Sequence, residues 1–332
     1  MPGNRSRRWP KRGAGSSSTE PKIPNEPCPG HRGLGVARLK IAQLFAKDPA
    51  HELLATFTNS KENWTFGIPA ELASVADFGA VAALFSSFKP EVVINCAAYS
   101  KVDQAEFERA QAYQVNAESV GFLAQEVKRL GSLLVHFSTD YIFDGKAGPY
   151  SEEARPNPLG YYAKTKYWGE EKVVRVGCRH LVARTNVLFG VHELASKPNF
   201  FMWLVGELSQ NRPVKIVSDQ YNNPTLADNL AALVKEAVEK NVEGILNLAG
   251  RTYLSRYDFA MRIARFFGYD HELITPIDTA SLKQPAPRPL LGGVRTEKAQ
   301  SVLKTPFYTV EESLAFLKKN YEPFFAAHPR PV

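Results

Sequence analysis

Short apolar runs alternate with helical patterns along this chain from residue 33 onward, and this alternation restricts the fold more than any other feature of the sequence. Residues 92–98 and 133–138 are largely apolar, which is typical of strands that are buried on both faces. Residues 34–47 and 161–176 carry apolar side chains at helical spacing. Because strands that alternate with helices build βαβ units, we predict an α/β protein with a doubly wound, Rossmann-like parallel sheet.

The same patterns predict the remaining elements. Strands are expected at 53–57, 180–187, 214–217 and 245–248, and helices at 77–88, 105–130, 199–210, 226–240, 255–267 and 310–320. The pattern becomes less regular beyond residue 190. We therefore predict a dinucleotide-binding domain at 30–190 and a small C-terminal α/β substrate-binding portion at 191–325. Residues 1–29 are expected to be a disordered basic tail, with an organelle transit peptide as the alternative.

The excess positive charge lies in the N-terminal region. Residues 1–40 hold nine Lys and Arg and two Asp and Glu, whereas the rest of the chain holds 32 of each sign. A neutral body with a basic tail does not predict a nucleic-acid-binding face. No run of about 18 apolar residues occurs, so no membrane-spanning segment is expected. The three cysteines are far apart and lack metal-ligand spacing, which favours a reducing, cytoplasmic location and no metal site.

Tyr162 and Lys166 give the strongest chemical signal in the sequence. One helical turn separates them, so both side chains project from the same side of the predicted helix. A neighbouring lysine cation can lower the pKa of a tyrosine from about 10 and so permit acid–base catalysis near neutral pH. This spacing recurs by chance in many helices, but here Thr139 precedes it at the carboxyl end of a buried strand, where open α/β sheets bind ligands. Thr139 is therefore expected to hydrogen-bond a substrate carbonyl oxygen beside Tyr162.

Several motifs occur in an order that resembles the dTDP-4-dehydrorhamnose reductases, which are extended short-chain dehydrogenases/reductases. The main ones are VVINCAAYSKVDQAE at 92–106, STDYIFDG at 138–145, PNPL at 156–159, YAKTK at 162–166, DQYNNPT at 219–225 and APRP at 286–289. The resemblance covers about residues 51–320, and several motifs in one order are far more specific than any single motif. It implies NADPH-dependent reduction of a 4-keto nucleotide sugar, with the last step of dTDP-rhamnose formation as the leading instance.

The resemblance also implies roles for individual residues. Thr139, Tyr162 and Lys166 would form a catalytic triad in which Tyr162 protonates the sugar C4 oxygen. Lys166 would lower the pKa of Tyr162 and hold the nicotinamide ribose. The cofactor would be bound by Gly30, Gly33, Gly35, Ala97, Ala98 and Asn116, together with Tyr162 and Lys166, and the sugar by Ser100, Val102, Asp140, Tyr141, Phe143, Asn186 and Arg288. Asn116 would support Lys166 through water, and a helix-capping or solvated role for it is equally consistent with the sequence.

Two segments depart from the family pattern. Thr185, Asn186 and Val187 stand where the family has a tryptophan-bearing strand end, so an aromatic platform for the sugar is missing and the sugar is not determined. Residues 30–35 resemble a glycine-rich phosphate-binding turn with one residue lost, but residues 21–29 contain four prolines and cannot form a central strand. A phosphate-binding loop, a glycine-bearing linker and a divergent or wrongly assigned start are all consistent with this segment.

The remaining predictions concern the cofactor, the core and partners. Residues 58–61 (TNSK) offer no acidic side chain for a ribose 2′-hydroxyl, which favours NADPH over NADH, although a polar surface turn explains them equally well. His136 and the apolar side chains Phe200, Phe201, Trp203 and Leu204 are predicted to belong to the core. An alternative function is that of a non-catalytic, cofactor-binding regulatory subunit resembling the β subunit of methionine adenosyltransferase. A third is a degenerate member that binds no cofactor. The resemblance implies a homodimer at most.

Overall fold

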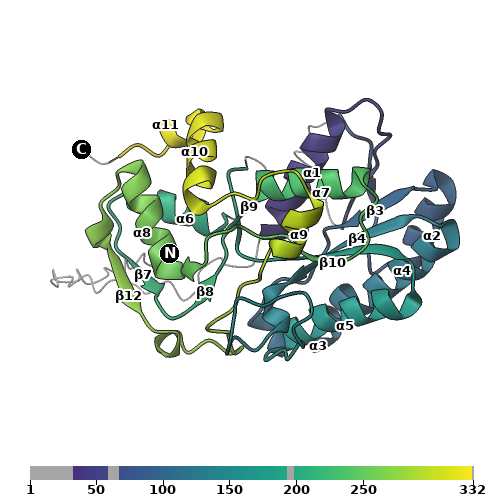
Figure 1. Cartoon of the computed structure of the whole chain (residues 1–332), viewed down its shortest axis with the longest axis horizontal. Helices are drawn as coiled ribbons and strands as arrows, with labels where there is room; N and C mark the ends of the chain where they lie inside the picture. Colours follow the sequence, from purple (N-terminus) through teal and green to yellow (C-terminus); the bar gives the residue numbers. More distant parts are fainter. Residues whose placement is uncertain (1–32, 59–66, 193–197, 331–332) are drawn as a thin grey trace, which may run out of the picture.

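The computed structural model describes residues 33–58, 67–192 and 198–330. Two units lie side by side, a sheet flanked by helices and a smaller unit that contains much of the C-terminal third of the chain (Figure 1). The predicted basic tail and residues 59–61 of the predicted cofactor turn lie outside the described residues.

A four-stranded parallel sheet forms the centre of the larger unit. Its order is β10 (Gly244–Asn247), β5 (Arg179–Thr185), β4 (Leu133–Thr139) and β3 (Val92–Asn95). Every residue of β4 is buried, as its apolar sequence predicts. Thr139 lies opposite Thr185 at the carboxyl ends of β4 and β5, which brings hydroxyl-bearing side chains to one edge of the sheet.

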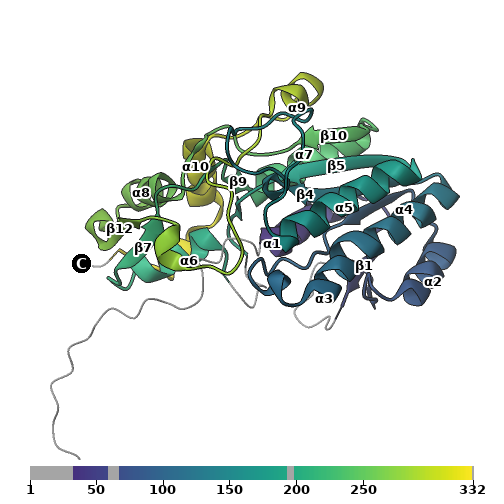
Figure 2. The same ribbon diagram turned by 90° about the horizontal axis from the view of Figure 1, so that it is seen from below.

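Helices cover both faces of this sheet, which confirms the predicted doubly wound fold (Figure 2). On one face, Leu133 and Val135 pack with apolar side chains of α1 (Gly33–Ala46) and α7 (Ala227–Glu239). On the other face, Leu134 packs with side chains of three helices. These are α2 (Phe78–Phe88), α4 (Ser119–Leu130) and α5 (Tyr161–Val176). Alternate residues of β4 therefore serve opposite layers, as strand geometry requires.

Within the described residues, the four-stranded sheet ends at β3. β1 (Ala55–Phe57) and β2 (Ala70–Leu72) pair in parallel with each other as a separate two-stranded sheet, and within the described part of the chain β3 pairs only with β4. Val92, Val93 and Ile94 are accordingly only half-buried. In a doubly wound sheet the strand that precedes the first helix lies between these two groups of strands. The residues before α1, including the predicted glycine turn at Gly30, lie outside the described residues.

The single helix predicted at 105–130 is wrong. The structure divides it into η1 (Gln104–Glu106), α3 (Arg109–Tyr113), a π-helical turn η2 (Gln114–Glu118) and α4. The amide of Asn116 in the π turn bonds to both backbone groups of Tyr99, at 2.8 and 3.0 Å. Such π turns often occur at functional sites, and a periodic apolar pattern does not reveal them.

The smaller unit has its own hydrophobic core, in which Phe200, Phe201 and Leu204 are buried and Trp203 packs against them, as predicted. Its elements and the remaining connections are η3 (Asp140–Ile142), β6 (Leu188–Phe189), α6 (Phe200–Leu208), β7 (Val214–Val217), β8 (Tyr221–Asn222), β9 (Thr225–Leu226), β11 (Leu254–Ser255), α8 (Arg256–Phe267), η4 (His271–Leu273), β12 (Ile274–Ile277), η5 (Ala280–Leu282), α9 (Glu297–Val302), α10 (Val310–Asn320) and α11 (Glu322–Ala326). The domain division at residue 190 stays a prediction. The structure adds that α7 and β10, which follow residue 190, pack in the larger unit.

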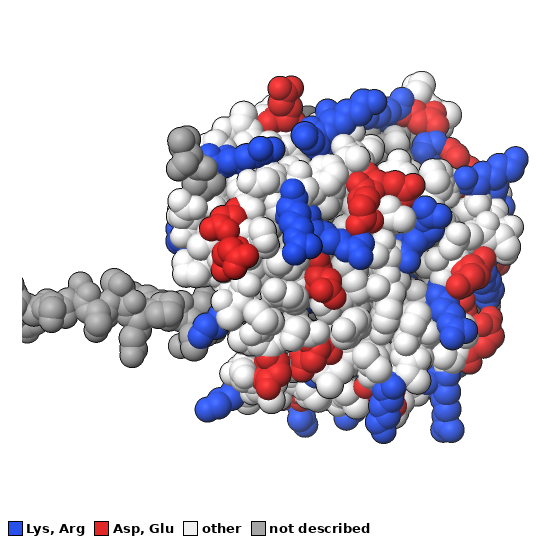
Figure 3. Space-filling model, turned by 60° about the vertical axis from the view of Figure 1, so that its left-hand side comes forward, with Lys and Arg blue, Asp and Glu red and all other residues white. Residues whose placement is uncertain are grey.

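On the face shown in Figure 3, charged side chains of both signs are interspersed among the described residues. Among the described helices, none is both long enough and apolar enough to cross a membrane.

Candidate functional site

The predicted triad comes together at the carboxyl end of the sheet. Thr139 ends β4, and Tyr162 and Lys166 lie one turn apart at the start of α5, with exposed fractions of 6%, 4% and 1%. The Thr139 side chain forms a hydrogen bond with Tyr162. It also accepts a bond of 3.2 Å from the backbone N–H of Tyr141, which fixes its position at the strand end. A substrate oxygen beside Tyr162 would therefore meet two hydroxyl groups.

The pKa of Tyr162 is raised in this structure, whereas the sequence predicted that Lys166 would lower it. Burial of the hydroxyl is the main cause, Tyr141 and Asp140 add to it, and the bond with Thr139 opposes it. Lys166 does not offset this rise, because its ammonium group donates a hydrogen bond to the carbonyl oxygen of Phe137 at 2.6 Å. Tyr162 is therefore held in its protonated form, which is the form that a proton donor requires.

Lys166 and His136 form a buried basic pair behind Tyr162. The Lys166 Nζ lies 3.4 Å from Nε2 of His136, whose Nδ1 faces the Asn95 amide at 3.2 Å. Burial lowers the pKa of Lys166 to about 8, and burial together with the Lys166 charge holds the pKa of His136 well below its usual value. His136 is a core residue, as predicted.

Lys166→Met is expected to stabilise the protein more at neutral pH than at alkaline pH. Because the folded-state pKa of Lys166 is about 8 and lies below the ordinary value of 10.5, the unfolded chain binds more protons between these two values. The free energy of unfolding of the parent chain therefore rises with pH across this window, by about 3 kcal/mol from this group alone. Urea unfolding of both proteins at about pH 7 and about pH 10 measures the difference. A difference that does not change with pH would contradict the burial of the charged lysine.

Asp140 anchors the loops around the triad. It is 2% exposed, and its Oδ2 accepts bonds from the Asn186 amide at 3.1 Å and from the Gly293 backbone N–H at 2.9 Å. Burial raises the pKa of Asp140, and these bonds oppose that rise. The next residue after Asn186, Val187, has φ of 38°, a left-handed conformation that β-branched residues rarely adopt. Asp140 therefore ties the ends of β4 and β5 to the segment around Gly293.

The other predicted sugar-binding residues take different places. Tyr141 and Val102 are buried in one cluster with Tyr162, and the Tyr141 ring lies edge-on to the Tyr162 ring at 6.2 Å. Ser100 is half-buried in the loop that follows β3. Phe143 is fully buried and stacks on Tyr150 at 4.3 Å, so in this structure its ring belongs to the core.

Arg288 approaches this cluster from the C-terminal unit. Its guanidinium donates to the Asp103 carboxylate and to the Ala286 carbonyl, each at 2.8 Å. Asp103 lies in the motif that starts with β3, so this ion pair joins the two units beside Tyr141. Asp103 was not among the predicted site residues, because a carboxylate in a loop gives no local signal of a partner 185 residues away.

The predicted cofactor residues are described only in part. Ala97 and Ala98 are half-buried after β3, and the Ala97 N–H donates to the Asn95 side chain at 3.0 Å. Gly33 starts α1, Gly35 is exposed in its first turn, and Gly30 lies outside the described residues. Ala97 and Ala98 therefore follow the strand that pairs with β4, whose last residue is Thr139.

Asn116 is bonded within the protein. Besides its bonds to Tyr99, its Nδ2 donates to the Thr165 hydroxyl at 3.0 Å, which positions the residue before Lys166. A Cβ atom on Gly169 would lie 2.4 Å from the Asn116 carbonyl oxygen, so only glycine permits this close approach of α5 to the π turn. Its cofactor role stays a prediction, and the observed contacts show a residue that supports the Lys166 helix.

Comparison with known proteins gives a family for this arrangement. The family model described as "RmlD substrate binding domain" matches residues 48–322. The chain belongs to this family. The dTDP-4-dehydrorhamnose reductase of Aggregatibacter actinomycetemcomitans is 36% identical over 222 residues, which are 63% of this chain and 74% of that protein.

Two further relatives bear on the RmlD assignment. The methionine adenosyltransferase 2 subunit beta of Mus musculus is 30% identical over 260 residues, which cover 74% of this chain and 75% of that protein. A crystal structure of dTDP-4-dehydrorhamnose reductase from Bacillus anthracis in complex with NADP has a TM-score of 0.73 at 24% identity, and the match covers 80% of this chain and 98% of that one. The latter similarity supports the fold alone.

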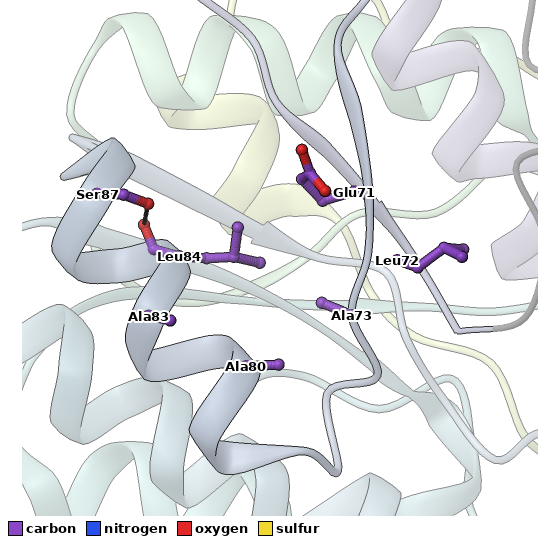
Figure 4. Close-up of a pocket in the computed structure, with 7 residues that line it drawn as sticks. All are labelled: Glu71, Leu72, Ala73, Ala80, Ala83, Leu84 and Ser87. Carbon is purple, nitrogen blue, oxygen red and sulfur yellow. Dashed lines mark hydrogen bonds between the residues drawn. The ribbon is translucent and has the colours of Figure 1, made fainter.

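Two other features of this RmlD family member lie apart from the triad. A cavity of about 360 Å³ is lined by residues of β2 and α2 and their surroundings, among them Leu72, Leu84 and Ser87 (Figure 4). Asp48, His51 and Glu239 come close enough to share a metal ion. The Lys235 ammonium already pairs with the carboxylates of Asp48 and Glu239, so a side chain offsets part of the negative charge of this group.

Proposed function

We propose that this protein is an NADPH-dependent reductase of a 4-keto nucleotide sugar, of the dTDP-4-dehydrorhamnose reductase type. The observation that carries the proposal is the hydroxyl pair of Thr139 and Tyr162 at the carboxyl end of the sheet, with Lys166 one turn behind it. The family assignment and the reductase relatives support the reaction class. A nucleotide sugar is then the small-molecule partner, and we expect a homodimer at most.

The residues near Tyr162 fit a nicotinamide cofactor. Ala97 and Ala98 give small side chains at the end of β3, and Lys166 offers a cation with no acidic partner within ion-pair distance among the described residues. When bound, the cofactor supplies a hydride to the carbonyl carbon. These residues would hold its nicotinamide end, while Gly33 and Gly35 at the start of α1 would lie toward its phosphates.

The protein's own part in the reaction is proton transfer to the carbonyl oxygen. The Tyr162 hydroxyl, whose raised pKa keeps it protonated, donates that proton. Thr139 donates a hydrogen bond to the same oxygen and so polarises the carbonyl. Lys166, one helical turn behind Tyr162, would hold the cofactor ribose. Asp140 and Asn186 keep the loops around the oxygen in place.

The second candidate is a cofactor-binding regulatory subunit without catalysis. The relation to the methionine adenosyltransferase 2 subunit beta favours it, as does the burial of all three triad residues. Such a protein would bind NADPH and a partner enzyme but would not turn over a sugar.

NADPH binding followed by a turnover assay distinguishes these functions. We expect the purified full-length protein to bind NADPH with micromolar affinity by nicotinamide fluorescence, and to oxidise NADPH when a dTDP-4-keto-6-deoxy sugar is added. Binding without turnover, together with co-purification of a synthetase, would favour the regulatory subunit. Absence of binding by folded protein would favour a degenerate member of the family that binds no cofactor. Cys96 and Cys178 are free, in keeping with the proposed cytoplasmic location.

A further inference from the structure

Arg256 is a buried cation that forms no ion pair with any residue in the described part of the chain. It is the first residue of α8 and is 5% exposed, and its Nη1 atom is buried without a hydrogen-bond partner. Asp258, two residues later, accepts a bond from the Ser255 hydroxyl at 2.7 Å. The other buried arginines near the site are satisfied, since Arg184 pairs with Glu170 and Arg288 with Asp103. Burying a guanidinium without an anion is unfavourable, so a position that retains one is a candidate for binding an anion from outside the protein.

The backbone and an aromatic ring hold Arg256 in place. The strands β8 and β11 pair just before it, and its backbone N–H donates to the Gln220 carbonyl at 2.9 Å. The guanidinium carbon lies 5.0 Å from the centre of the Phe200 ring, so one face of the group is covered by an aromatic side chain. Stacking of this kind fixes the plane of the guanidinium and leaves its N–H edge to donate hydrogen bonds.

The segment that holds Arg256 lies beside the loop that carries Arg288. The Tyr221 N–H, next to the Gln220 to which Arg256 bonds, donates to the Leu290 carbonyl at 2.6 Å. The positive charges of Arg288 and Arg256 both act to lower the pKa of Tyr141, against the larger effect of burial. The Tyr141 ring lies edge-on to the Tyr162 ring, so both guanidinium charges act on a residue that packs against the triad. The buried Tyr253 hydroxyl, three residues before Arg256, also lacks a hydrogen-bond partner and adds a second free donor from the same segment.

We infer that Arg256 binds the diphosphate of a nucleoside-diphosphate-linked substrate. The inference rests on the proposed function and identifies the group that would hold the substrate's nucleotide half. A planar guanidinium can make two parallel charge-assisted hydrogen bonds to a phosphate, and a diphosphate supplies the negative charge that Arg256 lacks. Because Arg288 is already paired with Asp103, Arg256 is the buried arginine whose charge is available to the substrate.

The test compares the parent protein with Arg256→Gln, Arg256→Lys and a control, Arg251→Gln. Arg251 lies five residues earlier, is 45% exposed and pairs with Glu312 at the surface. Arg251→Gln therefore removes the same charge from a position outside the proposed site. Calorimetry with thymidine diphosphate, inorganic pyrophosphate and NADPH measures the affinities, and thermal unfolding is recorded for each variant. We expect R256Q to weaken thymidine diphosphate binding by about 10- to 100-fold, R256K to lose less, and R251Q to bind like the parent. NADPH affinity should not change in any of them.

Thermal unfolding separates binding from a structural role, because loss of an unpartnered buried cation should leave the ligand-free melting temperature unchanged or raise it. Three results would overturn the inference: R256Q binds the nucleotide like the parent, it loses NADPH binding to the same extent, or its only effect is a lower melting temperature. So would binding of pyrophosphate without thymidine diphosphate. If the sugar is turned over equally well without Arg256, the proposed reductase function is supported and the role of Arg256 is wrong. If nucleotide binding depends on Arg256 but no sugar is turned over, the role of Arg256 is supported and the reductase function is wrong.

Discussion

Tyr162→Phe is expected to reduce turnover of a 4-keto nucleotide sugar by about 10²- to 10⁴-fold while NADPH affinity stays within a few-fold. The variant removes only the hydroxyl that bonds to Thr139 and leaves a ring that still packs against Tyr141. The loss should therefore appear in kcat, because the proton donor acts in the transition state and the ring preserves the fold. Steady-state assays of NADPH oxidation and fluorescence titrations measure the two quantities.

Tyr161→Phe is a matched control for this prediction. Tyr161 is the preceding residue of α5, and its ring is held edge-on to Trp168 at 5.8 Å and under the Arg109 guanidinium at 5.1 Å, away from Thr139. It should turn over substrate like the parent protein. Equal activity of the Tyr162→Phe variant and the parent would remove Tyr162 from the catalytic role, and equal losses in both variants would point to a disturbed helix.

Local sequence patterns predicted the elements that carry the site. The helix expected at 161–176 is found as Tyr161–Val176, and the strand that ends at Thr139 is buried throughout. Both elements have strong sequence signals. The apolar run and the helix boundaries at Gly160 and Gly177 are set by residues that are neighbours in the sequence, so they can be recognised without knowledge of the fold. The meeting of Thr139 with Tyr162 was predictable because the helix that follows a strand in a βαβ unit starts near the carboxyl end of that strand, where such folds bind ligands.

The missed features depend on contacts between distant residues. The bonds from Asn116 to Tyr99 and Thr165 convert the predicted long helix into a π turn, and no periodicity signals them. The contact of Lys166 with the Phe137 carbonyl depends on the side chain's conformation behind β4, so the sequence predicted the lysine's position and not its bond. Arg256 stands at the start of an ordinary amphipathic helix, and only its burial without a partner for Nη1, which the sequence does not show, distinguishes it.

Glu170→Gln is expected to lower the free energy of unfolding by about 3–5 kcal/mol. This is the largest stability effect that we expect from replacing one charged side chain near the site by a neutral one. Glu170 and Arg184 are each 2% exposed, and the guanidinium makes bonds of 2.7 to 3.2 Å to the carboxylate. The variant leaves the Arg184 charge buried between α5 and β5 without an anion. A loss of this size is a large part of the stability of an ordinary domain, and urea unfolding measures it.

The surface pair of Arg179 and Glu243 provides the control on the same strand. Its N–O distance is 2.8 Å, but both side chains are more than two-fifths exposed, so Glu243→Gln should cost less than about 1 kcal/mol. Replacing both buried partners, as in Glu170→Leu with Arg184→Met, should recover much of the loss because no unpaired charge remains.

Glu170 also raises the pKa of Lys166 by its charge. Glu170→Gln should therefore lower the pKa of Lys166 further, so that the rise in the free energy of unfolding with pH begins at a lower pH. A small loss in Glu170→Gln, equal to that of the surface control, would show that water reaches Arg184 and that α5 is held beside the sheet by its apolar contacts alone.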